Sequence, residues 1–199
     1  MRPLTHFYHL YQAGNWVEAV TEHAKALVDS GLADELSEVR IGLVGTDALA
    51  PATVFLDHGI QPVFVACAPF QWEQLTINKI REHVIRSDDY VLYAHTKGSA
   101  NESELNTAWR RSMTYYMVMC WREAVEHLSD VETVGCHWIE EGNHWGGNFW
   151  WARSQYLRTL PKPSDLSRFF AESWMSANPP SRVDMNPGWP AMERFTTQW

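Results

Sequence analysis

The spacing of hydrophobic and polar residues along the chain predicts a sheet of mostly parallel strands joined by helices. Apolar runs typical of buried strands fall at residues 5–11, 39–45, 62–67, 90–94, 131–138 and, more briefly, 147–151. Between and after them, apolar residues recur three or four apart at residues 15–30, 47–57, 71–86, 101–128, 154–160 and 166–175. This alternation indicates an α/β fold, with a Rossmann-like sheet covered by helices on both faces.

One domain is expected over residues 1–177, because 199 residues suffice for a single sizeable core. Residues 178–199 are rich in proline, so they are expected to form an extended tail packed on that domain.

Composition and charge narrow the class of protein. Hydrophobic residues make up 45% and charged residues 20%, as in a globular chain. A net charge of −8 without a basic run disfavours nucleic acid as the main partner. No apolar stretch has signal-peptide or membrane-span character, and no CxxC pair is present, so we expect a cytoplasmic protein with buried, reduced thiols at Cys67, Cys120 and Cys136.

The polar residues after the run at 90–94 form the first candidate site. His95, Thr96 and Lys97 can all donate hydrogen bonds, and they stand where a buried strand would end. Ligands of open α/β sheets bind beyond the carboxyl ends of strands, where the strand order reverses. A reversal between the first and fourth strands would place Tyr11 in the same crevice. An ordinary polar turn is the alternative interpretation.

Two common nucleotide sites are excluded by the sequence. The first strand is followed by Gly14, Asn15 and Trp16 rather than by a GxGxxG fingerprint, which argues against an NAD site. No P-loop sequence is present, which argues against an ordinary NTPase.

A second motif is rich in glycine and tryptophan and begins at His144. It reads His-Trp-Gly-Gly-Asn-Phe-Trp-Trp-Ala-Arg-Ser. The chain holds eleven tryptophans, and flat aromatic faces stack on sugars and bases, so the motif favours a carbohydrate or nucleotide site. Asn148 offers both a donor and an acceptor, and Trp150 and Trp151 would lie on opposite faces of a strand.

These two motifs together resemble a known family. Gly-Asn-Phe-Trp-Trp-Ala followed by Tyr-Leu and Leu-Pro, with His-Thr-Lys-Gly upstream, is similar to small bacterial and phage glycosyltransferases of the rhamnan-synthesis type. The resemblance runs from about residue 7 to residue 174 and implies a GT-A-like fold. It also implies transfer of a sugar from a nucleotide-diphospho-sugar to the hydroxyl of a saccharide, a protein or a modified base.

The chain departs from the GT-A pattern at the metal site. GT-A enzymes usually carry Asp-x-Asp after the fourth strand to hold a divalent metal, whereas this chain has His95, Thr96 and Lys97 there. We therefore expect Lys97 and His95 to supply the positive charge at the leaving diphosphate. Mn²⁺ or Mg²⁺ is not favoured as a cofactor.

The resemblance also implies roles for individual residues. The implied donor-binding residues are Tyr8, His9, Tyr11, Thr76, Lys79, Thr96, Gly98 and Asn148. Glu172 is the expected general base that deprotonates the acceptor, with Asp165 in reserve. The implied acceptor-binding residues are Trp145, Trp150 and Trp151. The structural alternatives are helix surface for Thr76, Lys79 and Glu172, and a core position for His9.

Two other classes of function stay open. One is a non-catalytic module that binds nucleotide-sugars or carbohydrates on the same fold. The other is a metal-dependent hydrolase, since two histidines and two glutamates lie within eight residues, at His137, Glu140, Glu141 and His144. Their spacing matches no HExxH pattern, and a polar turn explains them better. The donor sugar, its base and the oligomeric state are not specified by the sequence.

Overall fold

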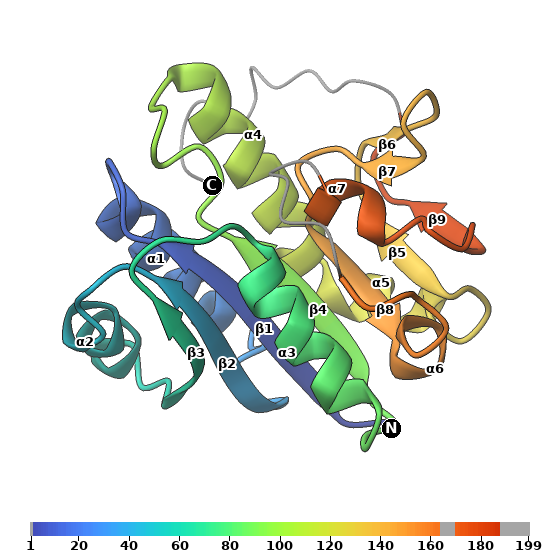
Figure 1. Cartoon of the computed structure of the whole chain (residues 1–199), viewed down its shortest axis with the longest axis horizontal. Coiled ribbons are helices and arrows are strands. Elements are labelled where there is room, and N and C mark those ends of the chain that lie inside the picture. Colours follow the sequence, from blue (N-terminus) through green and yellow to red (C-terminus); the bar gives the residue numbers. More distant parts are fainter. Residues whose placement is uncertain (1, 164–169, 188–199) are drawn as a thin grey trace.

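A seven-stranded sheet organises the computed structural model, which describes residues 2–163 and 170–187 (Figure 1). The strand order is β3-β2-β1-β4-β8-β5-β9. The strands are β1 (Leu4–Tyr11), β2 (Leu36–Val44), β3 (Pro62–Ala68), β4 (Tyr90–His95), β5 (Thr133–Gly135), β8 (Trp150–Arg153) and β9 (Arg182–Asp184). Strands β1 to β4 run parallel, β8 is antiparallel to both β4 and β5, and β9 is parallel to β5. A separate hairpin pairs β6 (Trp138–Ile139) with β7 (His144–Trp145).

Helices cover both faces of the sheet, as the sequence predicts. One face packs against α1 (Trp16–Asp29), α2 (Leu49–Asp57), α4 (Glu104–Thr114), the π-helix η1 (Tyr115–Met119) and α5 (Trp121–His127). The other face packs against α3 (Gln74–Val84), α6 (Ser154–Leu157) and α7 (Phe170–Trp174), which lie toward the viewer in Figure 1. The expected mostly parallel α/β fold is therefore confirmed.

The Trp150–Trp151 pair shows how one strand joins the two cores. Trp150 belongs to the core under α3, and Trp151 belongs to the core under α1 and η1. This confirms the prediction of one ring on each face, because successive side chains of a strand point to opposite sides.

Two predicted elements are divided or shortened in the structure. The helix expected over 101–128 is α4, η1 and α5 in succession, because Cys120 N bonds Tyr115 O five residues back and interrupts the α-helical pattern. The strand expected from residue 147 starts at Trp150, because Gly147 and Asn148 have φ of 82° and 60°, which no strand adopts. Of the helix expected over 166–175, residues 166–169 lie outside the described part of the chain.

The cysteines test the prediction of buried, reduced thiols. All three cysteines are free, but Cys67 is exposed and Cys120 is half-buried, so the expectation of buried thiols is wrong for Cys67. Cys67 lies on the edge strand β3, where one strand neighbour is missing.

The first part of the proline-rich tail supplies β9 at the opposite edge of the sheet. Within the described residues, every helix is too short or too polar to cross a membrane.

A pair of buried histidines links β1 to α1. His6 Nε2 lies 2.8 Å from His23 Nε2, and His6 Nδ1 lies 3.2 Å from Leu92 O. A carbonyl only accepts, so His6 Nδ1 carries the proton and His23 donates to His6 Nε2. Burial lowers the pKa of His6 to about 4 and the pKa of His23 well below its usual value. The folded protein therefore holds both rings neutral.

Acid is expected to destabilise the fold through this pair. Unfolded histidine binds protons near pH 6.5, whereas folded His6 does so only near pH 4. The stability contribution is therefore complete above pH 6.5 and is lost as the pH falls through this window, by about 3 kcal/mol for His6 alone. Urea unfolding at a series of pH values measures the slope. His6→Leu/His23→Leu should have a shallower slope, whereas the control His127→Leu, on the surface of α5, should not. An unchanged slope in the double variant would contradict this explanation.

Candidate functional site

The carboxyl ends of the two central strands β1 and β4 lie side by side. His9 is the register partner of His95, and Thr96 N donates to His9 O at 3.1 Å. Thr96 Oγ1 accepts from Tyr11 N at 2.9 Å, so the two strand ends are held together beyond the last register pair. This confirms the predicted order reversal between the first and fourth strands, and it brings His9, Tyr11, His95 and Thr96 to one place.

A half-buried carboxylate, Glu73, is the hub of the side-chain hydrogen bonds next to these strand ends. Tyr93 Oη donates to Glu73 Oε2 at 2.7 Å, and Asn148 Nδ2 donates to the same oxygen at 2.8 Å. Asn148 Oδ1 in turn accepts from Trp150 Nε1 at 2.9 Å. Sequence reasoning missed Glu73. Its only signal is an acidic residue just before α3, and such residues are common there.

The charge state of Glu73 depends on its neighbours. Burial by itself would raise the pKa of this carboxyl group. The nearby His95 and His9, and the hydrogen bonds from Tyr93 and Asn148, outweigh burial and lower the pKa of Glu73. The site therefore contains a fixed carboxylate that already accepts two hydrogen bonds.

The two site histidines are neutral in the free protein. Burial lowers the pKa of His9 to about 4, although Glu73 opposes the shift, and His9 Nδ1 pairs with Thr76 Oγ1 at 2.8 Å. Burial also lowers the pKa of His95, again against the influence of Glu73. His95 Nε2 lies 2.8 Å from Gly147 O, so it donates there, and its Nδ1 remains as an acceptor.

Lys97 provides a positive charge just beyond the carboxyl end of β4. Its Nζ lies 4.3 Å from the centre of the Trp109 ring, and it is half-buried. Across the described ranges, it has no carboxylate within ion-pair distance. Arg110 fixes the turn by donating to Lys97 O at 3.2 Å, and Arg110 is itself held by Glu22 of α1 at 3.0 Å. The ammonium group is thus held on a fixed turn with its charge available to an anion.

Gly98 ends this turn in a conformation that suits glycine. Its φ is 77°, and a Cβ at this position would lie 2.7 Å from Asn106 Cβ. Gly98 therefore serves the backbone of the turn between β4 and α4 rather than offering a side-chain contact.

The α7 helix brings a second carboxylate to the site. Glu172 Oε2 lies 3.9 Å from His144 Nε2 on β7, and its side chain is 31% exposed. Ala171 O accepts from Asn148 Nδ2 at 3.4 Å, which ties α7 to the Glu73 hub. The Glu172 side chain is therefore partly open to solvent, on a helix that is tied to Asn148 and Glu73. The reserve base, Asp165, lies outside the described residues.

Several expected contact residues are core residues instead. Trp145, Trp150 and Trp151 are at most 1% exposed, and each indole N–H donates inside the protein, so none offers a ring face to an acceptor. Tyr8 is 1% exposed and stacks on His23 with ring centres 4.4 Å apart, on the α1 side of the sheet. These four assignments are corrected, because burial in the two cores removes the surface that a ligand would touch.

The structure also contradicts the predicted donor-binding roles of Thr76 and Lys79. Thr76 is fully buried and its Oγ1 pairs with His9 Nδ1, so it offers no surface to a ligand. Lys79 pairs with Glu82 at 2.7 Å and lines a cavity with Arg40, away from the ends of β1 and β4.

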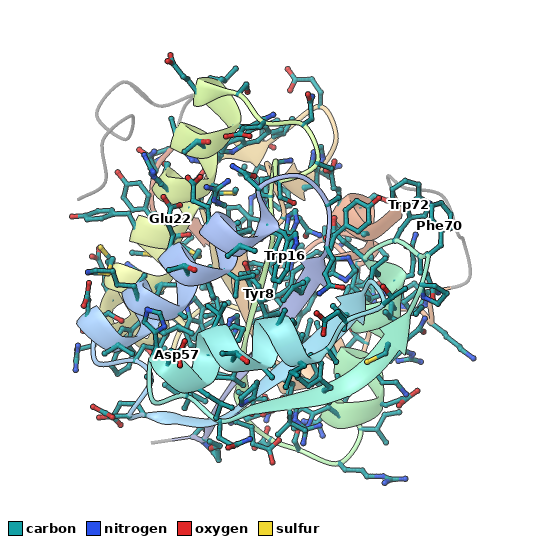
Figure 2. All side chains as sticks on the ribbon, turned by 90° about the vertical axis from the view of Figure 1, so that its left-hand side faces the viewer. Tyr8, Trp16, Glu22, Asp57, Phe70 and Trp72 are labelled. Atoms are coloured by element: carbon teal, nitrogen blue, oxygen red, sulfur yellow. The ribbon has the colours of Figure 1, made fainter. Side chains whose placement is uncertain are left out.

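An aromatic pair that sequence reasoning missed lies in the loop before Glu73. Phe70 is 73% exposed, and its ring centre lies 5.8 Å from that of Trp72. Figure 2 shows the two rings together at one side of the molecule, whereas Tyr8 lies inside it. Phe70 follows the carboxyl end of β3 by two residues, and its exposed ring offers a stacking surface that the buried tryptophans do not provide.

The histidine and glutamate cluster at 137–144 does not converge. His137 is 2% exposed, with Nε2 3.2 Å from Ser112 Oγ, whereas His144 faces Glu172. Across residues 2–163 and 170–187, no three His, Cys, Asp or Glu side chains are arranged to hold a metal ion. The described residues therefore give the hydrolase hypothesis no metal centre.

The strand ends also fit poorly with a metal held on a diphosphate. The turn after β4 carries a histidine, a threonine and a cationic lysine, and hard divalent cations prefer paired oxygen ligands. Glu73, the carboxylate next to the strand ends, already accepts hydrogen bonds from Tyr93 and Asn148. The residues of this turn therefore do not fit a divalent metal ion.

Comparison with known proteins places the chain in a family. The family model described as "Domain of unknown function (DUF8361)" matches residues 7–198. The chain belongs to this DUF8361 family. No curated protein sequence matches the chain.

Solved structures share the fold of this DUF8361 chain at low sequence identity. A protein described as a nucleotide-diphospho-sugar transferase from Desulfovibrio desulfuricans G20 has a TM-score of 0.52 and 12% identity, over 94% of this chain and 80% of that one. A 4-diphosphocytidyl-2C-methyl-D-erythritol synthase has a TM-score of 0.51 and 11% identity, over 96% and 91%. The mannosyltransferase PcManGT from Pyrobaculum calidifontis, solved with GDP-Man and Mn²⁺, has a TM-score of 0.51 and 12% identity, over 94% of this chain and 56% of that one. The fold is thus the GT-A-like fold of nucleotide-sugar transferases.

Proposed function

We propose that this chain is a glycosyltransferase that moves a sugar from a nucleotide-diphospho-sugar to an acceptor hydroxyl. The observation that carries the proposal is Lys97, a half-buried cation without a carboxylate partner in the described residues, held at the joined ends of β1 and β4. Negative charge develops on the leaving diphosphate during glycosyl transfer, and a fixed cation stabilises that charge. The shared fold of nucleotide-sugar transferases supports the assignment.

The remaining residues take roles that follow from their contacts. His95 donates to Gly147 O, so it positions the strand end while Lys97 supplies the fixed charge. Glu73, which is half-buried, offers a carboxylate to which sugar hydroxyls can donate, and Asn148, which is 1% exposed, positions that carboxylate through its Nδ2. Glu172, half-open beside His144, is the general base that takes the acceptor proton.

Turnover by the purified chain tests this proposal. UDP-, GDP- and dTDP-sugars would each be incubated with the protein and a mixture of saccharide acceptors, with water as the default acceptor of the sugar, and free nucleoside diphosphate would be measured in chelator and in Mn²⁺. We expect release from one class of donor at equal rates in both conditions. Binding without release would favour a non-catalytic module, and release only with Mn²⁺ would overturn the metal-independent mechanism.

The exposed ring of Phe70 is expected to stack on the donor base. Phe70→Ala should raise the donor KM about 5- to 150-fold with little change in kcat, since base–aromatic stacking contributes about 1–3 kcal/mol. Steady-state kinetics measure both constants. Leu49→Ala, which removes another exposed apolar side chain on α2, is the matched control and should leave KM unchanged. A wild-type KM in the Phe70 variant would remove the ring from the donor site.

A further inference from the structure

A cavity that is open to solvent lies between α3 and the strands β2 and β3, away from the ends of β1 and β4. Its volume is about 460 Å³. Its lining residues are Arg40, Val65, Lys79, Glu82, His83, Arg86 and Ser87. Lys79 and His83 follow Glu73 by six and ten residues along α3, so at 1.5 Å per residue His83 lies about 15 Å along the helix from the candidate active site. The cavity is therefore a separate feature of the molecule.

The cavity gathers positive charge on an acidic protein. Arg40 projects from β2, Lys79 from α3, and Arg86 from the segment just after α3. Glu82 is the one carboxylate among the lining residues, and it pairs with Lys79. Arg40 pairs with Glu38, which lies outside the lining, at 2.5 Å. Among the residues that the structure describes, Arg86 has no ion pair. Arg86 is therefore the lining cation whose charge is not already matched by a carboxylate, on a protein whose net charge is −8.

The wall of this cavity is fixed by a buried carboxylate behind it. Asp89 Oδ2 accepts from His83 Nε2 at 2.7 Å, and Asp89 Oδ1 accepts from Ser87 Oγ at 2.9 Å. The His83 ring also packs edge-on against Phe7, with ring centres 5.4 Å apart. Arg40 lies over the same Phe7 ring at 5.7 Å. These contacts hold His83, Ser87 and Arg40 in place before any ligand arrives, which lowers the cost of binding.

We propose that this cavity binds a small phosphorylated molecule. Arg40, Lys79 and Arg86 supply the charge-assisted hydrogen bonds that a phosphate group takes. Val65 is the one apolar residue in the lining, and the one ring in it is His83, which is held by Asp89 and packs edge-on against Phe7, so the lining has no Phe, Tyr or Trp on which a nucleobase would stack. Glu82 offers an acceptor for hydroxyl groups. The chemistry therefore fits a phosphosugar or a comparably small phosphate ester, and it does not depend on the proposed transferase activity.

Calorimetric titration of the full chain with inorganic phosphate and with glucose 6-phosphate tests this site. Wild type should bind both, and Arg86→Ser should bind roughly tenfold more weakly, the loss expected for one charge-assisted contact. Arg81→Ser removes the same charge from α3, outside the lining and five residues before Arg86, and Lys97→Ala removes the cation of the candidate active site. Both should bind as wild type does.

Three results would overturn the proposal. The first is no binding of either probe by wild type. The second is an Arg81→Ser loss as large as that of Arg86→Ser, which would show attraction by general charge. The third is loss of binding in Lys97→Ala, which would place the phosphate at the strand ends of β1 and β4. Thermal melts of each variant would confirm that the fold is intact, and Lys79→Ala provides a second test within the cavity should Arg86→Ser unfold.

Discussion

Lys97→Ala should lower kcat for glycosyl transfer about 10²- to 10³-fold, the usual loss when one fixed electrostatic stabiliser of a transition state is removed. The ammonium has no carboxylate partner in the described residues, so its charge is available to the diphosphate rather than neutralised within the protein. Donor KM should rise as well, because the ground-state diphosphate already carries negative charge. The fold should survive, since the Lys97 side chain is half-buried and the turn is held by Arg110 through a backbone oxygen.

Lys79→Ala is the matched control for this prediction. It removes the same side chain from α3, but Lys79 pairs with Glu82 and lines the separate cavity. Initial-rate kinetics on both variants measure the difference. Turnover near the wild-type rate in Lys97→Ala, with donor consumed at saturating concentration, would exclude Lys97 from the mechanism.

Glu172→Gln should lower kcat about 10²- to 10⁴-fold, as expected when a general base is lost. Glutamine keeps the shape and the hydrogen-bonding reach of the side chain but takes up no proton. His144 lies 3.9 Å from the carboxylate, so its position should change little. Donor KM should remain near its wild-type value, because Glu172 acts on the acceptor rather than on the diphosphate.

Single-turnover measurements separate the general base from a structural role for Glu172. In Glu172→Gln the donor should bind normally while its sugar is transferred slowly. Glu126→Gln, on an exposed position of α5, is the control and should transfer at the wild-type rate. A loss confined to donor affinity, with the transfer step unchanged, would contradict the assignment of Glu172 as base.

The strand ends could be predicted because they depend on topology alone. Parallel order and a reversal between the first and fourth strands are enough to place His95 and Thr96 beside His9 and Tyr11. Glu73 could not be predicted in this way. Its partners Tyr93 and Asn148 are 20 and 75 residues distant, and no local pattern records their approach.

The tryptophans show a different limit of sequence reasoning. An aromatic residue that fills a core and one that stacks on a ligand have the same composition signal. Trp145, Trp150 and Trp151 proved to be core residues, whereas Phe70, which no motif marked, is exposed. The helical spacing over 101–128 likewise continues through the π-helix at Tyr115–Met119, so periodicity could not reveal the break.

A crystal structure with a bound nucleotide-diphospho-sugar tests the central claim most directly. With the donor that shows turnover, the diphosphate oxygens should lie within hydrogen-bond distance of Lys97 Nζ, at the joined ends of β1 and β4, with no metal between them. A diphosphate bound away from Lys97, or held by a metal ion on Glu73, would contradict the account.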